Sequence, residues 1–416
     1  MVPPLPPLRA GLDIMPSPVP GRPGLLIRDP FRYADSTLIV PPPLVPCLAC
    51  FDGERTELDL RELLVRSTGS LQVGDMLRHL VDTLSSGGFL EDEVSGRLRE
   101  QRHSAFAEAE MREPSHAGSA YPAEPGPLRA VLSRQLDGTR ADDVEPPPAD
   151  DILAIAAPHV SPEGGWACYR AAYRALRPEH ASRTFLILGT SHFGPPESFG
   201  LTRKPFLTPL GATRVAADLI ERLAETGGPA ARMEDYCHSV EHSIEFQVVF
   251  LQYLFGHDIT ILPILCGPFA RSTEEGGPPE GDPHLARFLE ALGEMAERER
   301  GRLLWVLGID MAHMGRRYGD GLCARAGQAE MAVVARRDTQ RIERLTEADA
   351  EGFWSLIQEE ADPLKWCGSS PLYAFLRAAR PTGGKLLRYQ QWNIDEESVV
   401  SFAGLAFSRR STPGPE

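Results

Sequence analysis

The chain has 416 residues, 42% of them hydrophobic, and a formal net charge of -15 at pH 7. A chain of this length can bury one large core and a smaller one, so two or three domains are expected. The acidic surface repels phosphates, which disfavours nonspecific nucleic-acid binding, and no uncharged run approaches the roughly 18 residues of a membrane span. We therefore expect neither nucleic-acid nor membrane partners.

The cysteines and the N-terminal residues bear on the cellular compartment. Seven cysteines are scattered along the chain, and an odd number without a compact pattern does not indicate a disulfide framework. This usage favours a reducing cytoplasm. Residues 1–23 are rich in proline and lack the uninterrupted apolar stretch of a signal peptide, so we expect a disordered leader there.

A small domain is predicted at 24–93. Apolar stretches at 36–40 and 47–51 indicate two short strands, and apolar residues at helical spacing predict helices at 57–66 and 73–85. Two strands followed by two helices are typical of a winged-helix-like domain. Residues 94–111 are highly charged with little apolar surface, so we expect a solvated linker helix there.

A larger α/β domain is predicted at 112–408, where apolar strands alternate with amphipathic helices. Strands are expected at 151–157, 184–189, 259–265, 303–309 and 399–407. Helices are expected at 165–176, 212–226, 243–255, 284–298, 322–344, 348–359 and 371–379. This alternation favours a mixed or mostly parallel sheet flanked by helices. Residues 409–416 are expected to be a disordered tail.

Candidate metal ligands follow three of these strands. His159 comes directly after the first strand, His192 after the second, and Asp310 and His313 after the strand at 303–309. Side chains at the carboxyl ends of neighbouring strands can converge although they lie far apart in sequence. Cys367 precedes a helix, where the helix dipole stabilises a thiolate. Two imidazoles, a carboxylate and a thiol gathered there would form a metal pocket.

Each of these residues also has a structural interpretation. A single histidine at a strand end is more often a structural or surface residue, Asp310 could cap a turn with His313 on the surface, and a free cysteine such as Cys367 is most often a small buried hydrophobe. His242 lies at a helix start in Glu-His-Ser-Ile-Glu, where a capped, hydrogen-bonded histidine is the simpler interpretation. The chain lacks the Gly-x-Gly-x-x-Gly, Walker and Gly-x-Ser-x-Gly motifs, which argues against common nucleotide-binding and serine-hydrolase functions.

The order and spacing of these motifs resemble those of the MEMO family, which includes the AmmeMemoRadiSam system protein B type. The resemblance covers about 112–407. It is carried by 112–121 (REPSHAGSAY), 157–159 (APH), 187–192 (ILGTSH), 241–245 (EHSIE), 261–265 (ILPIL), Asp310 with His313, and 367–368 (CG).

The resemblance implies a fold similar to that of class III extradiol ring-cleaving dioxygenases, with a metal pocket. The family's metal-binding His, His and Cys correspond to His159, His192 and Cys367, with Asp310 and His313 in the same pocket. Iron(II) or copper is the implied cofactor. A thiolate replaces the carboxylate of the two-His, one-carboxylate iron sites, which favours softer metals.

Two departures from the family pattern concern the pocket. Residues 160–165 (VSPEGG) stand where the family commonly has Ala-Gly-Tyr, and Phe193 replaces a second histidine. The first change puts the shape of the pocket and any substrate preference in doubt. The N-terminal domain resembles a PqqD-like winged helix, which binds peptides in other systems.

Two functions follow as alternatives. The first is a metal-dependent oxidoreductase in which Asp310 orients a ligand or accepts a proton and His313 or His242 acts as general acid or base. The second is a non-catalytic module that binds a peptide or a protein and acts with a radical-SAM partner.

Overall fold

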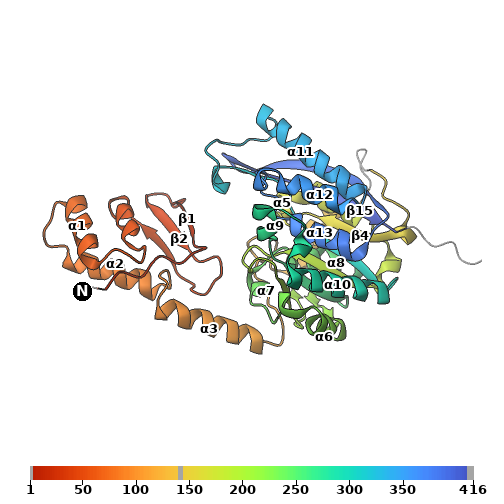
Figure 1. Ribbon diagram of the computed structural model, residues 1–416, viewed down its shortest axis with the longest axis horizontal. Helices are drawn as coiled ribbons and strands as arrows, with labels where there is room; N and C mark the ends of the chain where they lie inside the picture. Colours follow the sequence, from red (N-terminus) through yellow and green to blue (C-terminus); the bar gives the residue numbers. More distant parts are fainter. Residues whose placement is uncertain (1–2, 139–143, 410–416) are drawn as a thin grey trace, which may run out of the picture. The chain divides into compact units, whose positions relative to one another are not determined.

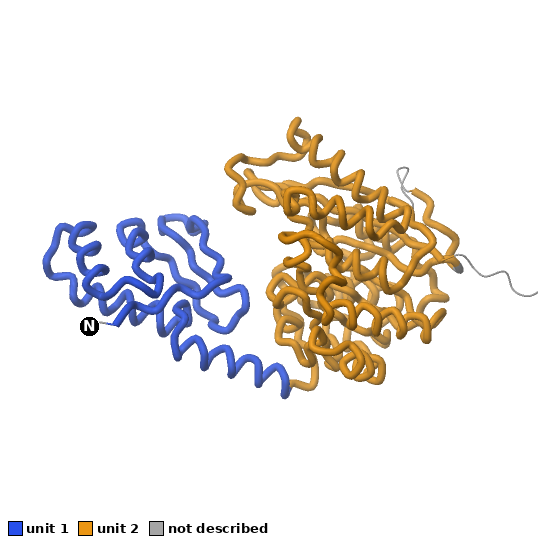
Figure 2. The backbone as a smooth tube through the Cα atoms, viewed as in Figure 1, with its two compact units in different colours: residues 1–108 blue, residues 109–416 orange. Residues whose placement is uncertain are grey.

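A computed structural model describes residues 3–138 and 144–409 of the chain, which divides into two compact units, Met1–Glu108 and Ala109–Glu416 (Figure 2). The first unit ends with α3 (Glu93–Glu108), within the segment where the linker helix was expected. Residues 410–416 of the expected tail lie outside the described residues. Within the described ranges, no helix combines the length and apolar character that a membrane crossing requires.

The first unit contains a three-stranded antiparallel sheet in the order β1–β2–β3. The strands and the helices that accompany them are β1 (Asp13–Pro16), β2 (Leu25–Arg28), β3 (Thr37–Val40), α1 (Glu57–Thr68), α2 (Gly74–Ser86) and α3. Buried leucines of α1 and α2, at 60, 64, 77, 80 and 84, form the core with Ile27 and Val40 of the sheet. The winged-helix-like assignment of this unit stays a prediction.

The expected disordered leader is wrong for residues 3–23. The backbone N–H groups of Leu5 and Leu8 donate to carbonyls at 2.7 and 2.9 Å, and Leu5 is buried. Arg9 forms a buried ion pair with Asp29 at 2.9 Å. The proline content was misleading because the residues between the prolines keep their N–H donors and still pair with the body of the unit.

The strand predicted at 47–51 is also wrong, because a 3-10 helix, η1 (Pro42–Cys50), occupies most of this segment. Proline fixes φ and removes a hydrogen-bond donor, which disfavours a ladder partner in a sheet. The apolar pattern reflects burial instead, since Cys47, Leu48 and Cys50 all lie in the core.

The second unit is built on a ten-stranded mixed sheet, counted over the described residues, in the order β10–β6–β11–β5–β12–β4–β15–β13, with β9 beside β11 and β14 beside β15. Its strands are β4 (Ile152–Ala157), β5 (Thr184–Thr190), β6 (Phe199–Leu201), β9 (Arg214–Val215), β10 (Ala231–Met233), β11 (Thr260–Cys266), β12 (Leu303–Gly308), β13 (His313–Gly315), β14 (Gly383–Asp395) and β15 (Ser398–Ser408). The central strands β11, β5, β12 and β4 are parallel. The predicted α/β fold is therefore confirmed.

Helices cover both faces of this sheet (Figure 1). Along β5, Leu186 and Leu188 pack into the core beneath α6, α10 and α13, whereas Phe185 and Ile187 pack into the core beneath α4, α5 and α8. A strand buried on both faces shows a continuous apolar run, which is why these strands were predictable. The helices are α4 (Pro125–Leu136), α5 (Pro162–Tyr173), α6 (Ala217–Thr226), α7 (Cys237–Val240), α8 (Glu245–Phe255), α9 (Ala270–Glu275), α10 (Pro283–Arg298), α11 (Ala329–Thr346), α12 (Ala350–Gln358) and α13 (Ser369–Ala379).

The prediction omitted several short elements (β6, β9, β10, α7, α9 and β13) and two longer ones, α4 and β14. Strand β14 pairs with β15 as a long antiparallel hairpin and is mostly half-buried, with charged and amide side chains among its residues. Its polar character hid it from a search for apolar runs. Helix α4 begins at a proline, as many helices do, and buries Leu128, Leu132 and Leu136 against the second core.

Candidate metal centre

The carboxyl ends of three adjacent parallel strands bring the predicted ligands to one edge of the sheet. In the register of the sheet, Gly308 of β12 lies opposite Ala157 of β4 and Gly189 of β5. His159, His192 and Asp310 follow these positions closely along the chain, so the strand register itself sets their proximity.

Three histidines form a group that could hold a metal ion. His159, His192 and His242 each offer a ring nitrogen, and these atoms lie within 4.8 Å of one another. The ring centroids are 4.9 Å apart for His159 and His192 and 5.1 Å apart for each of the other two pairs. His159 is buried and His242 is partly buried, whereas the His192 side chain keeps 27% of its surface exposed, so the group is open on one side. His242 had been predicted as an acid or base beside the ligands.

Hydrogen bonds at Nδ1 orient two of these rings. Nδ1 of His159 lies 3.0 Å from the carbonyl oxygen of Gly308, and because a carbonyl only accepts, this nitrogen carries the proton. Nδ1 of His192 lies 2.9 Å from Oε2 of Glu241. Each ring therefore turns Nε2 toward the group, and this is how metal-binding histidines are usually held.

Glu241 is a site residue that the sequence prediction missed. Its side chain is buried, and besides His192 Nδ1 it accepts hydrogen bonds from the backbone N–H groups of His192 and of Phe193, the latter at 3.1 Å. Burial lowers the pKa of His192, but the carboxylate of Glu241 and the neighbouring Cys367 together outweigh burial and raise the pKa well above its ordinary value. The available signal was the position of Glu241 beside His242, which suggested only a helix cap.

Cys367 lies against the histidine group. Its Sγ is 3.3 Å from Nε2 of His159 and 3.7 Å from the carbonyl oxygen of Asp310, and it also hydrogen-bonds His192. Burial would raise the pKa of Cys367, but the two histidines outweigh burial and lower the pKa to about 7. Gly368 allows this approach, since a Cβ there would lie 2.6 Å from Cβ of Ile309.

Asp310 is buried and contacts both the backbone and the ring of His159. Its Oδ1 accepts the backbone N–H of His159 at 3.0 Å, and its Oδ2 lies 3.5 Å from His159 Nε2. Burial raises the pKa of Asp310 from 3.8 to about 6, against the opposing influence of His313. A carboxyl group with this pKa can accept or release a proton near neutral pH.

His313 begins β13 and lies near the same edge. Its Nδ1 donates to the carbonyl oxygens of Met311 and Lys365 at 2.9 and 3.1 Å, and its ring meets that of Tyr318 at 4.9 Å. Burial lowers the pKa of His313, partly offset by the carboxylate of Asp310. No sequence pattern pointed to Tyr318.

A second buried carboxylate, that of Glu245, binds residues 112–121 at the start of the second unit. Glu245 pairs with Arg112 and accepts hydrogen bonds from Tyr121 and from the backbone N–H of His116, the last at 3.0 Å. The ring of His116 lies 5.5 Å from that of His242. Of the two carboxylates in the Glu-His-Ser-Ile-Glu motif, Glu241 therefore holds His192 and Glu245 holds His116, and both of these rings neighbour His242.

The donor set fits a transition metal. Neutral imidazoles suit iron, copper and zinc, and a thiolate adds preference for softer ions. The protons shared between Cys367 and the histidines are those that a metal ion would displace on binding. The site residues that the sequence predicted, His159, His192, Cys367, Asp310, His313 and His242, all belong to this edge of the sheet.

Comparison with known proteins gives consistent matches. A family model described as "Memo-like protein" matches residues 112–406. A "MEMO1 family protein" of Aquifex aeolicus is 26% identical over 388 residues, which covers 92% of this chain and 95% of that protein. Another, from Thermococcus kodakarensis, is 29% identical over 314 residues, covering 72% of this chain and 100% of the relative. A third, from Desulfurococcus amylolyticus, is 26% identical over 308 residues, covering 71% of this chain and 98% of the relative.

Proposed function

The chain belongs to the Memo-like protein family, and from this premise we propose that its histidine group is a metal centre serving oxidation–reduction chemistry. The observation that carries the proposal is the convergence of three imidazoles within 4.8 Å, two of them oriented by hydrogen bonds at Nδ1. Hydrogen bonds that fix the ring orientation in this way are typical of metal-binding histidines. A histidine with a purely structural role does not need them.

His159, His192 and Cys367 would hold the ion, with His242 as a fourth donor. The pKa of His242 is well below its ordinary value because of burial and the neighbouring His192 and His159, which keeps the imidazole neutral and suits it to binding a cation. Iron(II) or copper is the proposed metal, and it would supply one-electron chemistry when bound.

The protein's own acids and bases would manage protons around that ion. Asp310, with a pKa of about 6, is placed to orient a ligand or take a proton beside His159. His313 is the proposed general acid or base, since Nδ1 is held by two carbonyl groups and Nε2 is left for proton transfer.

Elemental analysis after anaerobic purification tests the proposal. We expect about one iron or copper ion per chain in the wild-type protein and its loss when His192 and Cys367 are both replaced by alanine. A control with alanine at His284 and Cys323, which are both exposed and not among the proposed ligands, should keep the metal. A metal-free wild-type protein with an unchanged fold would refute the proposal.

Recognition of a peptide, or of a radical-SAM partner, is a second proposed function. It is supported by the edge strand β3, which pairs with β2 on one side among the described strands of the first unit. Ile39 of β3 lines a groove of about 690 Å³ together with Leu26 and Leu38. An unpaired strand edge beside apolar side chains is suited to binding an extended peptide.

A pull-down from the native host tests this second function. Wild-type bait should recover a stable partner, and Ile39→Asp bait should recover it poorly because the substitution places a charge in the groove. Recovery of chaperones alone, or equal recovery with both baits, would count against partner recognition.

A further inference from the structure

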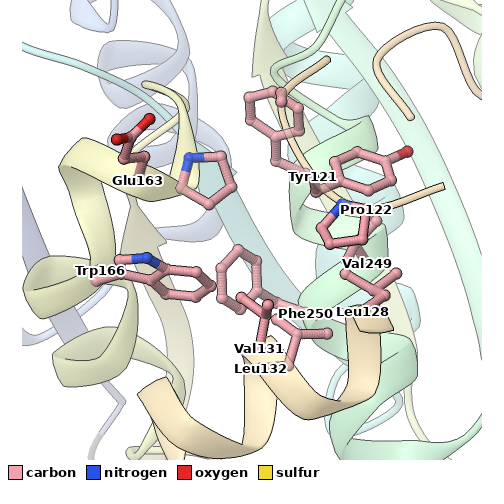
Figure 3. A pocket seen from close by; sticks show the side chains of 12 residues that line it. Tyr121, Pro122, Leu128, Val131, Leu132, Glu163, Trp166, Val249 and Phe250 are labelled. Atoms are coloured by element: carbon pink, nitrogen blue, oxygen red, sulfur yellow. The ribbon is translucent and has the colours of Figure 1, made fainter. Parts of the chain in front are cut away.

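An apolar cavity of about 230 Å³ lies within the second unit between α4, α5 and α8. Figure 3 shows Trp166 on one side of the space and Tyr121 and Pro122 on the other, with Phe250 and Leu132 below them. Its lining is almost wholly apolar, and it opens to solvent beside the exposed Glu163, so an apolar group can enter it and displace water from these side chains.

The walls of the cavity are fixed before any ligand arrives. The ring of Phe250 is stacked on Tyr169 at 4.3 Å and on Tyr173 at 5.1 Å. Tyr169 Oη donates to the carbonyl oxygen of Val160 at 3.0 Å, and Tyr121 Oη donates to Glu245. Because these hydroxyl groups are satisfied outside the cavity, the aromatic faces that remain are available for an apolar guest, and little ordering is needed on binding.

The cavity adjoins the histidine group through the starts of two helices. His242 lies just before α8, and its ring is 5.4 Å from that of Phe246, which lines the cavity. His159 lies just before α5, whose first residues Pro162 and Glu163 line the cavity from the other side. A wall residue of the cavity, Phe246, and His242 of the histidine group therefore lie one helical turn apart.

We propose that this cavity binds a neutral aromatic ring of a ligand whose polar end reaches the histidine group. An engineered apolar cavity of about 150 Å³ is known to bind benzene, so the larger volume here accommodates one ring system. It is smaller than the roughly 300–1,000 Å³ of pockets that enclose whole drug-sized ligands, so the rest of the ligand lies outside it. The claim about the polar end rests on the proposed metal centre, whereas the claim about the ring does not.

The carboxylate at the rim of the cavity and its apolar lining indicate the charge of the ring that the cavity binds. Glu163 is the one ionisable carboxylate among the residues described as lining it, and it is exposed at the rim. An anionic substituent on the ring would meet this carboxylate, and the apolar lining disfavours burial of a charge of either sign, so a neutral ring is preferred. Pro162 and Glu163 belong to 160–165, the segment that differs from the sequence expected from the MEMO resemblance.

Two probes test the two ends of the ligand separately. Indole binding to the wild-type protein is followed by saturation-transfer NMR, and Val131→Trp, which fills the cavity from α4, should abolish it. Val333→Trp on exposed α11 is the matched control and should bind indole like the wild type. Trp166→Ala removes one wall and should weaken indole binding about tenfold, which decides the question if Val131→Trp fails to fold.

The polar end is tested by comparing the affinities of acetohydroxamate and 3-phenylpropanohydroxamate for the metal-containing protein. The two compounds share the metal-binding hydroxamate group, and only the second carries a ring. The phenyl compound should bind about tenfold tighter or more to the wild type, and no tighter than acetohydroxamate to Val131→Trp. Equal indole binding by wild type, Val131→Trp and Trp166→Ala would overturn the inference. If the metal proposal alone fails, acetohydroxamate does not bind, the phenyl compound binds through its ring alone, and the indole difference between Val131→Trp and Val333→Trp remains.

Discussion

Replacing Glu241 by glutamine should weaken metal binding by about 10–100-fold, which corresponds to roughly 1.4–2.8 kcal/mol. The structure supplies the reason. Oε2 of Glu241 accepts from Nδ1 of His192 at 2.9 Å, while Oε1 accepts backbone N–H groups. Glutamine can keep the backbone contacts with its carbonyl oxygen, but its NH₂ group then faces Nδ1. His192 must accept at Nδ1, and its proton moves to Nε2, where the ligand lone pair is needed.

The assay is competition against a chelator of known affinity under anaerobic conditions at one fixed pH. Glu234→Gln is the matched control, because Glu234 also accepts from a hydroxyl and a backbone N–H, at 2.8 and 3.2 Å, away from the site. The unfolding free energy of Glu241→Gln should fall by no more than about 1–3 kcal/mol. Equal metal dissociation constants for Glu241→Gln and wild type would refute the argument that Glu241 sets the tautomer of His192.

Three further predictions concern stability. Asp338→Asn should lower the unfolding free energy by about 1–3 kcal/mol in urea titrations, because the buried carboxylate accepts from Trp366 Nε1 at 2.7 Å and from two hydroxyl groups; an unchanged midpoint would contradict this. Burial raises the pKa of Glu245, but the positive charge of Arg112 outweighs burial and holds the pKa below its ordinary 4.5. The ionised Glu245 therefore stabilises the folded state above pH 4.5, and this stabilisation is lost as the pH falls below that value. Glu245→Gln should show a flatter loss of stability in acid than wild type, and parallel curves would count against it. Leu292→Ala in the core of α10 should cost about 2–5 kcal/mol by thermal unfolding with metal content unchanged, and a cost near zero would mean that this core is not packed as described.

The central strands could be predicted from the sequence because both of their faces are buried. Strand β5 was expected at 184–189 and spans Thr184–Thr190, and β12 was expected at 303–309 and spans Leu303–Gly308. A strand with two buried faces needs apolar residues at every position, which is a strong local signal. Strand β14 gave no such signal, since it is mostly half-buried with polar residues among its positions, and its place depends on pairing with β15.

The site residues likewise fall into those that a local sequence pattern predicted and those that it did not. Its strand-terminal residues were predictable because chain direction alone sends the ends of parallel strands to one edge. Glu241 was not predictable, because its bond to His192 joins residues 49 positions apart through loop packing that no local pattern encodes. In the first unit, the leader was misjudged for a related reason: its N–H groups pair with distant carbonyls, and composition does not report such pairing.

One segment links the histidine group to the apolar cavity. Glu245 holds Arg112 and the backbone of His116, and it also accepts the hydroxyl proton of Tyr121, whose ring lines the cavity. His116 in turn lies 5.5 Å from His242. The ion pair of Arg112 with Glu245 is buried, so losing one partner leaves an uncompensated buried charge at this anchor. Ring binding and the surroundings of His242 therefore depend on the same anchor, which physically couples recognition of a ligand's apolar end to the chemistry proposed for its polar end.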